Sequence, residues 1–250
     1  PWYQRWVFIY QTGGWRGLPL LPPNTWLPSE KKMASRFGVA MGGIAQPICE
    51  LQHEGSSTRL LIRRILIRLP LKTSRRTRTI MKSRRASMLT PSTSAYVNKL
   101  DFVILGALEV DTKFNVNVVV GSDGVITGAQ GGHPDTAAGA KCTIVIAPLL
   151  QGRSPAICTE CTTITTPGET VDVVVTDYGI AINPKRTDII EAAKDCDLPI
   201  CTIEELRDKA YAMVGEPDPV QFDDRVVGII EARDGSIMDV VRKVKPYEFK

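Results

Sequence analysis

The sequence has no hydrophobic run long enough to cross a bilayer, few cysteines and no tryptophan after residue 26. A membrane-spanning helix needs about 20 consecutive apolar residues, whereas the longest apolar runs here, such as residues 171–176, have the length of a strand. Six cysteines in 250 residues are too few for a disulfide scaffold, and no signal-peptide pattern opens the chain. We therefore expect a cytoplasmic protein with reduced thiols and no membrane contact. Because the first residue is Pro1 rather than methionine, we also expect a fragment.

Acidic residues are missing between residues 55 and 100, where twelve basic residues occur. The net charges of residues 1–54, 55–100 and 101–250 are +2, +12 and −10, so the overall +4 comes from one stretch. Positive charge alone suffices for phosphate contact, which leaves a non-catalytic polyanion-binding α/β module as an alternative function. No aromatic residue lies between His53 and Tyr96 to stack on bases, so we do not expect nucleic acid as a partner.

Two segments do not read as ordinary folded sequence. Residues 1–36 hold all four tryptophans and many glycines and prolines without periodicity, so we expect an irregular segment, which could come from a non-native reading frame. In the basic stretch 56–94, residues 60–68 could form a basic amphipathic helix, and the remainder has the composition of a disordered tail. Sequence rich in Arg, Ser, Thr and Leu without acidic residues is also a common product of out-of-frame translation.

Elsewhere in residues 37–250, strand and helix patterns alternate. Apolar runs predict strands, and alternation of apolar and polar residues over 114–120 predicts a strand with one polar face. A capping box, Thr202 with Glu205, opens a predicted helix, and residues 233–236 form a hairpin turn. The predicted strands are 37–44, 102–108, 114–120, 143–147, 171–176, 179–182, 225–231 and 237–244, and the predicted helices are 186–196 and 202–214. We therefore predict an α/β domain with a mostly parallel sheet flanked by helices and a late antiparallel hairpin.

The densest glycine cluster, residues 121–132, connects a predicted strand to His133 and the residues after it. Glycine lets backbone N–H groups approach a ligand closely, so such a loop can hold an anion or a developing oxyanion. It lies where α/β sheets commonly bind ligands. The glycines could instead serve tight turns, with Asp135 and Thr136 as N-caps of a helical turn over 137–141. Both interpretations remain open.

His133 lies beside this loop and could act as a general acid or base near neutral pH; it could also be an incidental loop residue. Asp135 is the nearby carboxylate that could take a site role.

Cys158 and Cys161 form a Cys-x-x-Cys pair, a spacing used by zinc and redox sites. A structural zinc site usually needs four ligands, and Cys142, Cys196 and Cys201 supply no second pair. We therefore expect no metal, with both cysteines filling packed positions.

Carboxylates that could suggest acid–base chemistry are expected to be solvated. The pair Glu204 and Glu205 lies in the first turn of a predicted helix, where negative charge offsets the helix dipole. The others are Asp172, Asp177, Asp223 and Asp224.

Long ordered motifs cover residues 95–250: VNKLD (97–101), GALEVDTKFNVN (106–117), GSDG (121–124), GGHPDTA (131–137), TPGETVD (166–172), DYGIAINP (177–184), DRVV (224–227) and DGS (234–236). Together they resemble the C-terminal half of the citrate lyase alpha subunit family, the citrate CoA-transferase component. Upstream, FGVAMGGI (37–44) and LQHEG (51–55) look like family segments of the same domain. The family pattern vanishes between residues 56 and 94.

The resemblance implies a CoA-transferase-like fold and an activity. An acetyl-carrier thioester and citrate would give a citryl-carrier thioester and acetate, through a mixed anhydride and without a covalent enzyme ester. The implied partners are the acyl carrier protein subunit and the citryl-lyase subunit of a citrate lyase complex. No covalently bound cofactor is implied, since the thioester belongs to CoA or to a pantetheine-type group on the carrier. A general acyl-CoA:carboxylate CoA-transferase is the enzymatic alternative.

The resemblance also implies site residues. His133 and Asp135 would be catalytic residues that orient substrate, while loop amides would stabilise thioester oxyanions. The implied substrate-binding residues are Gly106, Asn115, Gly121, Asp123, Gly124, Gly131, Gly132 and Thr136.

The reading-frame interpretation of residues 56–94 can be tested in the coding DNA. We expect compensating frame shifts near both ends of this stretch and an uninterrupted alternative frame that encodes acidic, family-like sequence. DNA sequencing checks this, and an alternative frame broken by stop codons would contradict it.

Overall fold

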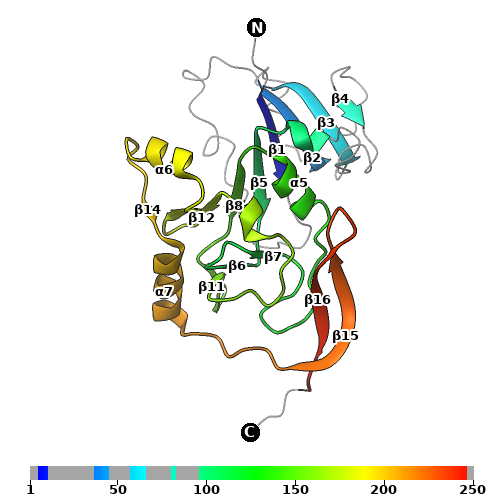
Figure 1. The fold of residues 1–250 in the computed structure, drawn as a ribbon, viewed down its shortest axis with the longest axis vertical. Coiled ribbons are helices and arrows are strands. Elements are labelled where there is room, and N and C mark those ends of the chain that lie inside the picture. Colours follow the sequence, from blue (N-terminus) through cyan, green and yellow to red (C-terminus); the bar gives the residue numbers. More distant parts are fainter. Residues whose placement is uncertain (1–4, 11–36, 45–56, 66–79, 83–95, 247–250) are drawn as a thin grey trace.

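The computed structural model describes residues 5–10, 37–44, 57–65, 80–82 and 96–246. A nine-stranded sheet forms one end of the molecule, with smaller sheets and a long hairpin below it (Figure 1). Its strands, in spatial order, are β14 (Ile200–Cys201), β13 (Ile180–Ile182), β12 (Val173–Val175), β8 (Thr143–Ile146), β5 (Phe102–Gly106), β1 (Arg5–Tyr10), β2 (Phe37–Ile44), β3 (Ser57–Ile65) and β4 (Ile80–Lys82). Every neighbouring pair is parallel except β12 and β13. The predicted mostly parallel sheet is confirmed.

The first four strands correct part of the sequence interpretation. Strand β1 lies inside the segment that we expected to be irregular, and it joins β2 to β5 at the centre of the sheet. Residues 60–65, predicted to open a basic helix, belong to strand β3, which pairs with β2 on one side and β4 on the other. Pairing on both edges and the abundance of isoleucine favour the extended conformation there. The sequence also favours a helix-like turn over residues 47–54, which lie outside the described residues.

Strands β5, β8 and β12 build the core of the described region. Val103, Leu105, Val145 and Val174 are at most 1% exposed. In β5 and β8 buried residues alternate with half-buried ones, so one face of these strands packs more tightly than the other. Short apolar runs of this kind are typical of strands that are buried inside a parallel sheet.

A three-stranded sheet of β11 (Ile157–Cys158), β6 (Glu109–Asp111) and β7 (Val116–Asn117) lies below the main sheet (Figure 1), and β9 (Leu150–Gln151) pairs with β10 (Ser154–Pro155). The polar face predicted for residues 114–120 is wrong, because Asn117 is fully buried. Its amide nitrogen donates to Glu109 and to the Val120 carbonyl, and its amide oxygen accepts from the amides of Val119 and Val120. Burial is tolerated because every polar atom of the side chain has a partner.

The helices are short except for the last one. They are η2 (Tyr96–Lys99), α5 (His133–Gly139), η3 (Gly168–Thr170), α6 (Thr187–Ala193) and α7 (Ile203–Val214). Both hydrogen bonds of the predicted capping box at α7 are present: the Thr202 hydroxyl accepts from the Glu205 amide (3.1 Å), and the Glu205 carboxylate accepts from the Thr202 amide (2.7 Å). In the described part of the chain, no helix has the length and apolar character needed to cross a membrane.

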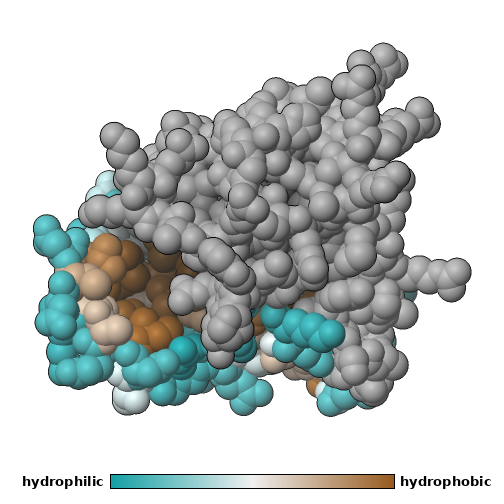
Figure 2. Space-filling model, turned by 90° about the horizontal axis from the view of Figure 1, so that it is seen from above, coloured by the Kyte–Doolittle hydropathy of each residue, from teal (hydrophilic) through white to brown (hydrophobic). Residues whose placement is uncertain are grey.

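The predicted late hairpin is confirmed as β15 (Phe222–Glu231) and β16 (Ile237–Val244). Its turn uses Gly235 at φ +88°, a conformation that glycine adopts readily, and the Asp234 carboxylate accepts bonds from the amide and hydroxyl of Ser236. The hairpin turn reaches up beside α5 (Figure 1). Seen from above, the described part of the molecule has a hollow of hydrophobic residues that is bordered by hydrophilic ones (Figure 2).

Candidate active site

The first half of the glycine-rich segment 121–132 is a tight turn. The Gly121 amide donates to the Val125 carbonyl (2.8 Å), and the Gly124 amide donates to the Gly121 carbonyl (2.9 Å). The Asp123 carboxylate accepts from the Val125 amide (3.0 Å), and Gly124 has φ +77°. At Gly121, Asp123 and Gly124, the turn interpretation therefore describes what these residues do in the structure.

The second half of the segment presents backbone donors. Gly131 has φ +58°, and Gly132 is the buried residue that precedes α5. Within the described residues, the amides of Gly131 and Gly132 have no backbone acceptor. Two successive N–H groups that have no acceptor among the described residues could bind a carbonyl oxygen that acquires negative charge. Of the glycines predicted to bind substrate, these two fit the oxyanion interpretation.

His133 is fully buried directly after these glycines. Its Nε2 lies 2.9 Å from the Gly106 carbonyl oxygen, and its Nδ1 lies 2.6 Å from the Thr166 hydroxyl. Since the carbonyl can only accept, Nε2 carries the proton and Nδ1 accepts from Thr166. Burial lowers the pKa of His133 to about 4, although the bond to the Gly106 carbonyl acts in the opposite direction. A neutral imidazole held on both nitrogens favours a positioning role over direct proton transfer.

Asp135 and Thr136 lie inside α5, so their predicted role as N-caps is wrong. The helix begins at His133, and Gly132 is its N-cap residue without a side-chain bond; Pro134 suits the first turn because it has no N–H to satisfy. The Thr136 hydroxyl donates to the carbonyl oxygens of Gly132 and His133, which fixes the end of the glycine segment. The Asp135 carboxylate lies 3.9 Å from the Arg233 guanidinium.

Gly106 supports this segment from strand β5, whereas Asn115 lies in the turn between β6 and β7 and bonds to other parts of the chain. Gly106 ends β5, and its carbonyl holds His133. The Asn115 side chain accepts from the Gly168 amide (2.8 Å) and donates to Asp111 (3.0 Å). Both residues therefore have structural partners, and their predicted contact with substrate stays a prediction.

The β15–β16 hairpin covers the glycine-rich segment. The Gln130 side chain donates to the Glu231 carbonyl (2.9 Å), and Arg233 donates to the Asp135 carbonyl (3.0 Å). A Cβ atom on Gly124 would lie 2.5 Å from Val244 and 2.8 Å from Val220, so only glycine permits this approach without rearrangement. The hairpin region therefore contacts the glycine-rich segment at Gly124 and Gln130 and the following helix at Asp135.

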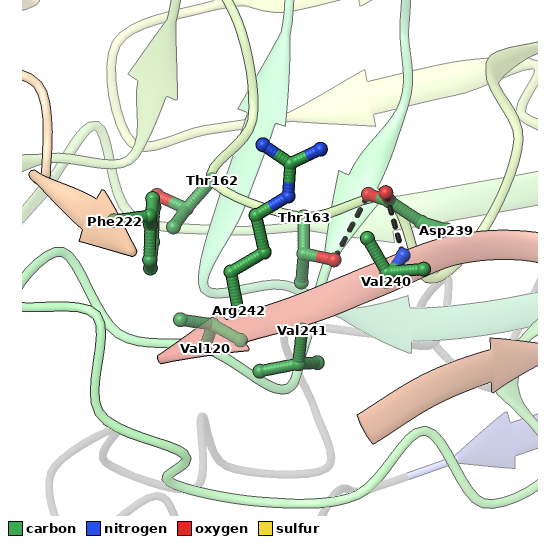
Figure 3. Close-up of a pocket in the computed structure, with 8 residues that line it drawn as sticks. All are labelled: Val120, Thr162, Thr163, Phe222, Asp239, Val240, Val241 and Arg242. Carbon is green, nitrogen blue, oxygen red and sulfur yellow. Dashed lines mark hydrogen bonds between the residues drawn. The ribbon is translucent and has the colours of Figure 1, made fainter. Parts of the chain in front are cut away.

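A cavity of about 180 Å³ lies where the hairpin meets the strands. Its lining comes from Val120, residues 162–163, Phe222 and residues 239–242 (Figure 3). Asp239 accepts bonds from the Thr163 hydroxyl (2.9 Å) and the Ile164 amide (2.7 Å), and the Arg242 side chain extends toward the segment that carries Thr162 and Thr163 (Figure 3). Arg242 lines this cavity, and a guanidinium group can bind the carboxylate of a ligand through two parallel hydrogen bonds.

Sequence reasoning missed all of these cavity residues. Arg242 lies on a strand of ordinary polar and apolar composition, and Thr162 and Thr163 lie in a connection without a motif. Only the packing of the hairpin against that connection brings them together, so no local signal could have identified them.

Sequence reasoning also missed Glu109, which lies beside Cys158 and Cys161. One ligand atom from each of the three residues lies within 4.8 Å of the other two, and all three residues are buried. Burial raises the pKa of the Cys161 thiol well above its usual range, and the neighbouring Cys158 acts in the same direction. A thiol held protonated in this way is a poor nucleophile.

The expectation that Asp172 is solvated is wrong. Its side chain is 9% exposed, and its carboxylate accepts from the Thr143 amide (2.7 Å) and pairs with Arg186 (3.0 Å). Arg186 also lowers the pKa of the exposed Asp188 to about 2. These ion pairs join α6 to the main sheet and make Asp172 structural. Asp177 also accepts from the Leu149 amide (2.7 Å), but it is exposed, as expected.

Comparison with solved structures gives the fold class. The structure matches the 4-hydroxybutyrate CoA-transferase of Porphyromonas gingivalis with a TM-score of 0.50, at 15% identity over 86% of this chain and 48% of that one. At this identity the match shows the fold alone, which is CoA-transferase-like.

Sequence comparison then gives the family. The model of the family "Citrate lyase, alpha subunit (CitF)" matches residues 25–244, so this chain belongs to the citrate lyase alpha subunit family, and the predicted resemblance is confirmed. The citrate lyase alpha chain of Haemophilus influenzae is 53% identical over 154 residues, which are 62% of this chain and 31% of that protein. A crystal structure of a citrate lyase alpha subunit from Streptococcus mutans, in complex with citrate, has a TM-score of 0.85 and 41% identity over 98% of this chain and 48% of that one.

The chain thus spans half or less of the length of these relatives. The family match runs across residues 56–94, where we expected the pattern to be interrupted. The origin of that stretch stays a prediction for the coding DNA.

Proposed function

We propose that this chain takes part in acyl exchange as an alpha subunit of citrate lyase, converting an acetyl-carrier thioester and citrate into a citryl-carrier thioester and acetate. The observation that carries the proposal is the family match over residues 25–244. The crystal structure of the Streptococcus mutans relative, which is described as a complex with citrate, supports the substrate class. The proposal includes a cytoplasmic location, the carrier and citryl-lyase subunits as partners, and a pantetheine-type thioester as the acyl carrier.

The proposed exchange takes place in two steps. A citrate carboxylate attacks the acetyl thioester carbonyl, and the carrier thiolate leaves as the mixed anhydride forms. The thiolate then attacks the citryl carbonyl of the anhydride, and acetate leaves. Each step places negative charge on a carbonyl oxygen, which the amides of Gly131 and Gly132 are positioned to stabilise. His133 holds these amides in place through Gly106 and Thr166.

The cavity supports the same proposal from the substrate side. It lies beside Val120, the residue before the glycine-rich segment, and its lining holds the positive Arg242 as well as Asp239, whose carboxylate already accepts bonds from Thr163 and Ile164. Citrate carries carboxylates, which guanidinium groups bind well. Asp135 lies near the Arg233 guanidinium, and this contact would help to orient the glycine-rich segment.

A valine at position 132 tests the assignment. Gly132 has φ −104°, which valine tolerates, so we expect Gly132→Val to keep the fold while its side chain blocks approach to the amides. Citryl-thioester formation, measured with acetyl-carrier, citrate and the companion subunits, should fall by about 100-fold or more.

Gly228→Val is the matched control, because Gly228 lies on the hairpin and an added Cβ would meet its nearest atom at 3.7 Å. Equal turnover in the Gly132→Val chain and the wild type would contradict the role of the loop. No citryl thioester from the wild-type chain would contradict the function itself, and turnover of free acetyl-CoA without any carrier would favour a general CoA-transferase.

A further inference from the structure

Three potential metal ligands meet where strands β6 and β11 lie side by side. The strands pair in parallel, with Asp111 opposite Cys158, and Glu109 begins β6. Cys161 follows three residues after Cys158, so the chain returns to the same point. One ligand atom each from Glu109, Cys158 and Cys161 lies within 4.8 Å of the other two. Exposed fractions of 8%, 6% and 9% show that all three residues are screened from solvent.

The surroundings of this cluster are rich in acceptors. The Cys158 thiol lies against the carbonyl oxygens of Val110 (3.6 Å) and Glu160 (3.3 Å), and the Cys161 thiol lies against that of Asn115 (3.3 Å). The buried carboxylate of Asp111 adds a further acceptor nearby.

No cation balances these groups in the part of the chain that the structure describes. The ion pairs found there do not involve Glu109 or Asp111. Glu109 is instead held by neutral donors, the side chain of Asn117 and the amide and hydroxyl of Thr162. Buried charges in proteins are normally paired or bound to a metal, so this position favours a cation.

Ligand type narrows the choice of cation. Two thiolates select zinc and similar soft ions over magnesium or calcium, and a carboxylate oxygen is an accepted third zinc ligand. Tetrahedral coordination with Zn–S bonds of about 2.3 Å places two sulfurs about 3.8 Å apart, so ligand atoms that lie within 4.8 Å of one another need to approach by at most about 1 Å. The Glu109 Oε1 atom accepts a single bond, from the Thr162 hydroxyl, and an oxygen of a carboxylate can serve a second partner.

We propose that Glu109, Cys158 and Cys161 form a binding site for Zn²⁺, with a fourth position open beside Thr162. Binding replaces two thiol protons, so one Zn²⁺ enters and two H⁺ leave. Thr162 also lines the cavity described above, and the metal therefore joins β6, β11 and one wall of that cavity. The site stands on its own contacts and does not depend on the proposed acyl exchange.

Cobalt titration of the reduced chain, freed of metal by a chelator, tests the proposal. We expect one Co²⁺ per chain, with a thiolate-to-cobalt charge-transfer band that Zn²⁺ abolishes by displacement. Cys158→Ser and Cys161→Ser should lose the band, and Glu109→Gln should weaken Co²⁺ binding more than about tenfold, as expected when a ligand is lost. Cys196→Ser is the matched control, because Cys196 is an exposed free thiol and its loss should leave the band unchanged.

A second measurement needs no variant. Stoichiometric Zn²⁺ should slow alkylation of Cys158 and Cys161 in the wild-type chain by more than about tenfold, as followed by peptide mass spectrometry, while alkylation of Cys196 continues at its original rate. A wild-type chain without the thiolate-to-cobalt band would overturn the proposal. So would a band lost only on replacement of Cys196, or equal slowing of all three thiols.

Discussion

Replacing Gly168 by alanine is expected to lower the free energy of unfolding by about 3 kcal/mol or more. A Cβ atom at this position would lie 1.9 Å from the Lys113 carbonyl oxygen and 2.8 Å from the Phe114 carbonyl carbon. Both are backbone atoms, so no side-chain rotation relieves the clash. The turn that they belong to is already constrained, because Phe114 has φ +65°, an uncommon conformation for a large residue.

Thermal unfolding followed by circular dichroism measures this effect. For a chain of this size the expected loss corresponds to a decrease in Tm of about 6 to 12 °C. Gly106→Ala is the matched control, since an added Cβ there meets nothing within 4 Å, and its Tm should stay near that of the wild type. If Gly168→Ala and Gly106→Ala have the same Tm, the close contact between residues 113–115 and residue 168 is not present in solution.

Acidification is expected to destabilise the fold through His133. Its pKa is about 4 in the folded protein because of burial, against 6.5 for the ordinary group, so the unfolded chain takes up the proton first as the pH falls. The stability contributed by neutral His133 is complete above pH 6.5 and is lost progressively between 6.5 and 4. The difference in pKa corresponds to about 3 kcal/mol in all, of which about 2 kcal/mol is lost between pH 7.5 and 5.

Urea unfolding of the wild type and of His133→Asn at several pH values measures this contribution. We expect the variant to be less stable at pH 7.5. It should lose less stability on acidification because it lacks the buried imidazole, and the loss that remains comes from carboxylates, which both proteins contain. His53→Asn is the control for the other histidine of the chain. Parallel pH profiles for the wild type and His133→Asn would mean that the imidazole is not buried as a neutral group.

Elements whose causes lie within a few residues were predictable from the sequence. The hairpin follows from its Arg-Asp-Gly-Ser turn between apolar runs, and α7 follows from the Thr202–Glu205 capping box. Strand β2 was predicted with the bounds that the structure gives. In each case the residues that specify the conformation are also the residues that adopt it.

Strands β1 and β3 were missed because their conformation depends on distant partners. Strand β1 pairs with β5, whose first residue in the pairing, Phe102, is far along the chain from Val7, and β3 is an internal strand between β2 and β4. Pairing of this kind overrides a local helical pattern. The local sequence pattern of neither segment indicates these strand pairings.

The candidate site was located by its glycines, but the tasks of its side chains were not predictable. A lone histidine next to a glycine-rich loop suggests proton transfer, whereas His133 is fully buried and has both ring nitrogens in hydrogen bonds. Asn117 was predicted to lie on the polar face of a strand and Glu109 was not singled out, yet both are buried and bonded to each other (2.8 Å). Burial is a property of the assembled fold, which sequence spacing alone does not specify.

The hairpin above the glycine-rich segment has a consequence for how the chain matures. Its contacts join residues far apart in sequence: Gln130 meets Glu231 across 101 positions, and Thr163 meets Asp239 across 76. Closing such long loops carries an entropic cost before any contact forms, and a chain leaving the ribosome folds from its N-terminal side. The sheet can therefore assemble before residues 222–244 have been made, whereas the compartment lined by Arg242 cannot. Competence to bind a ligand there would be acquired only after the sheet has formed.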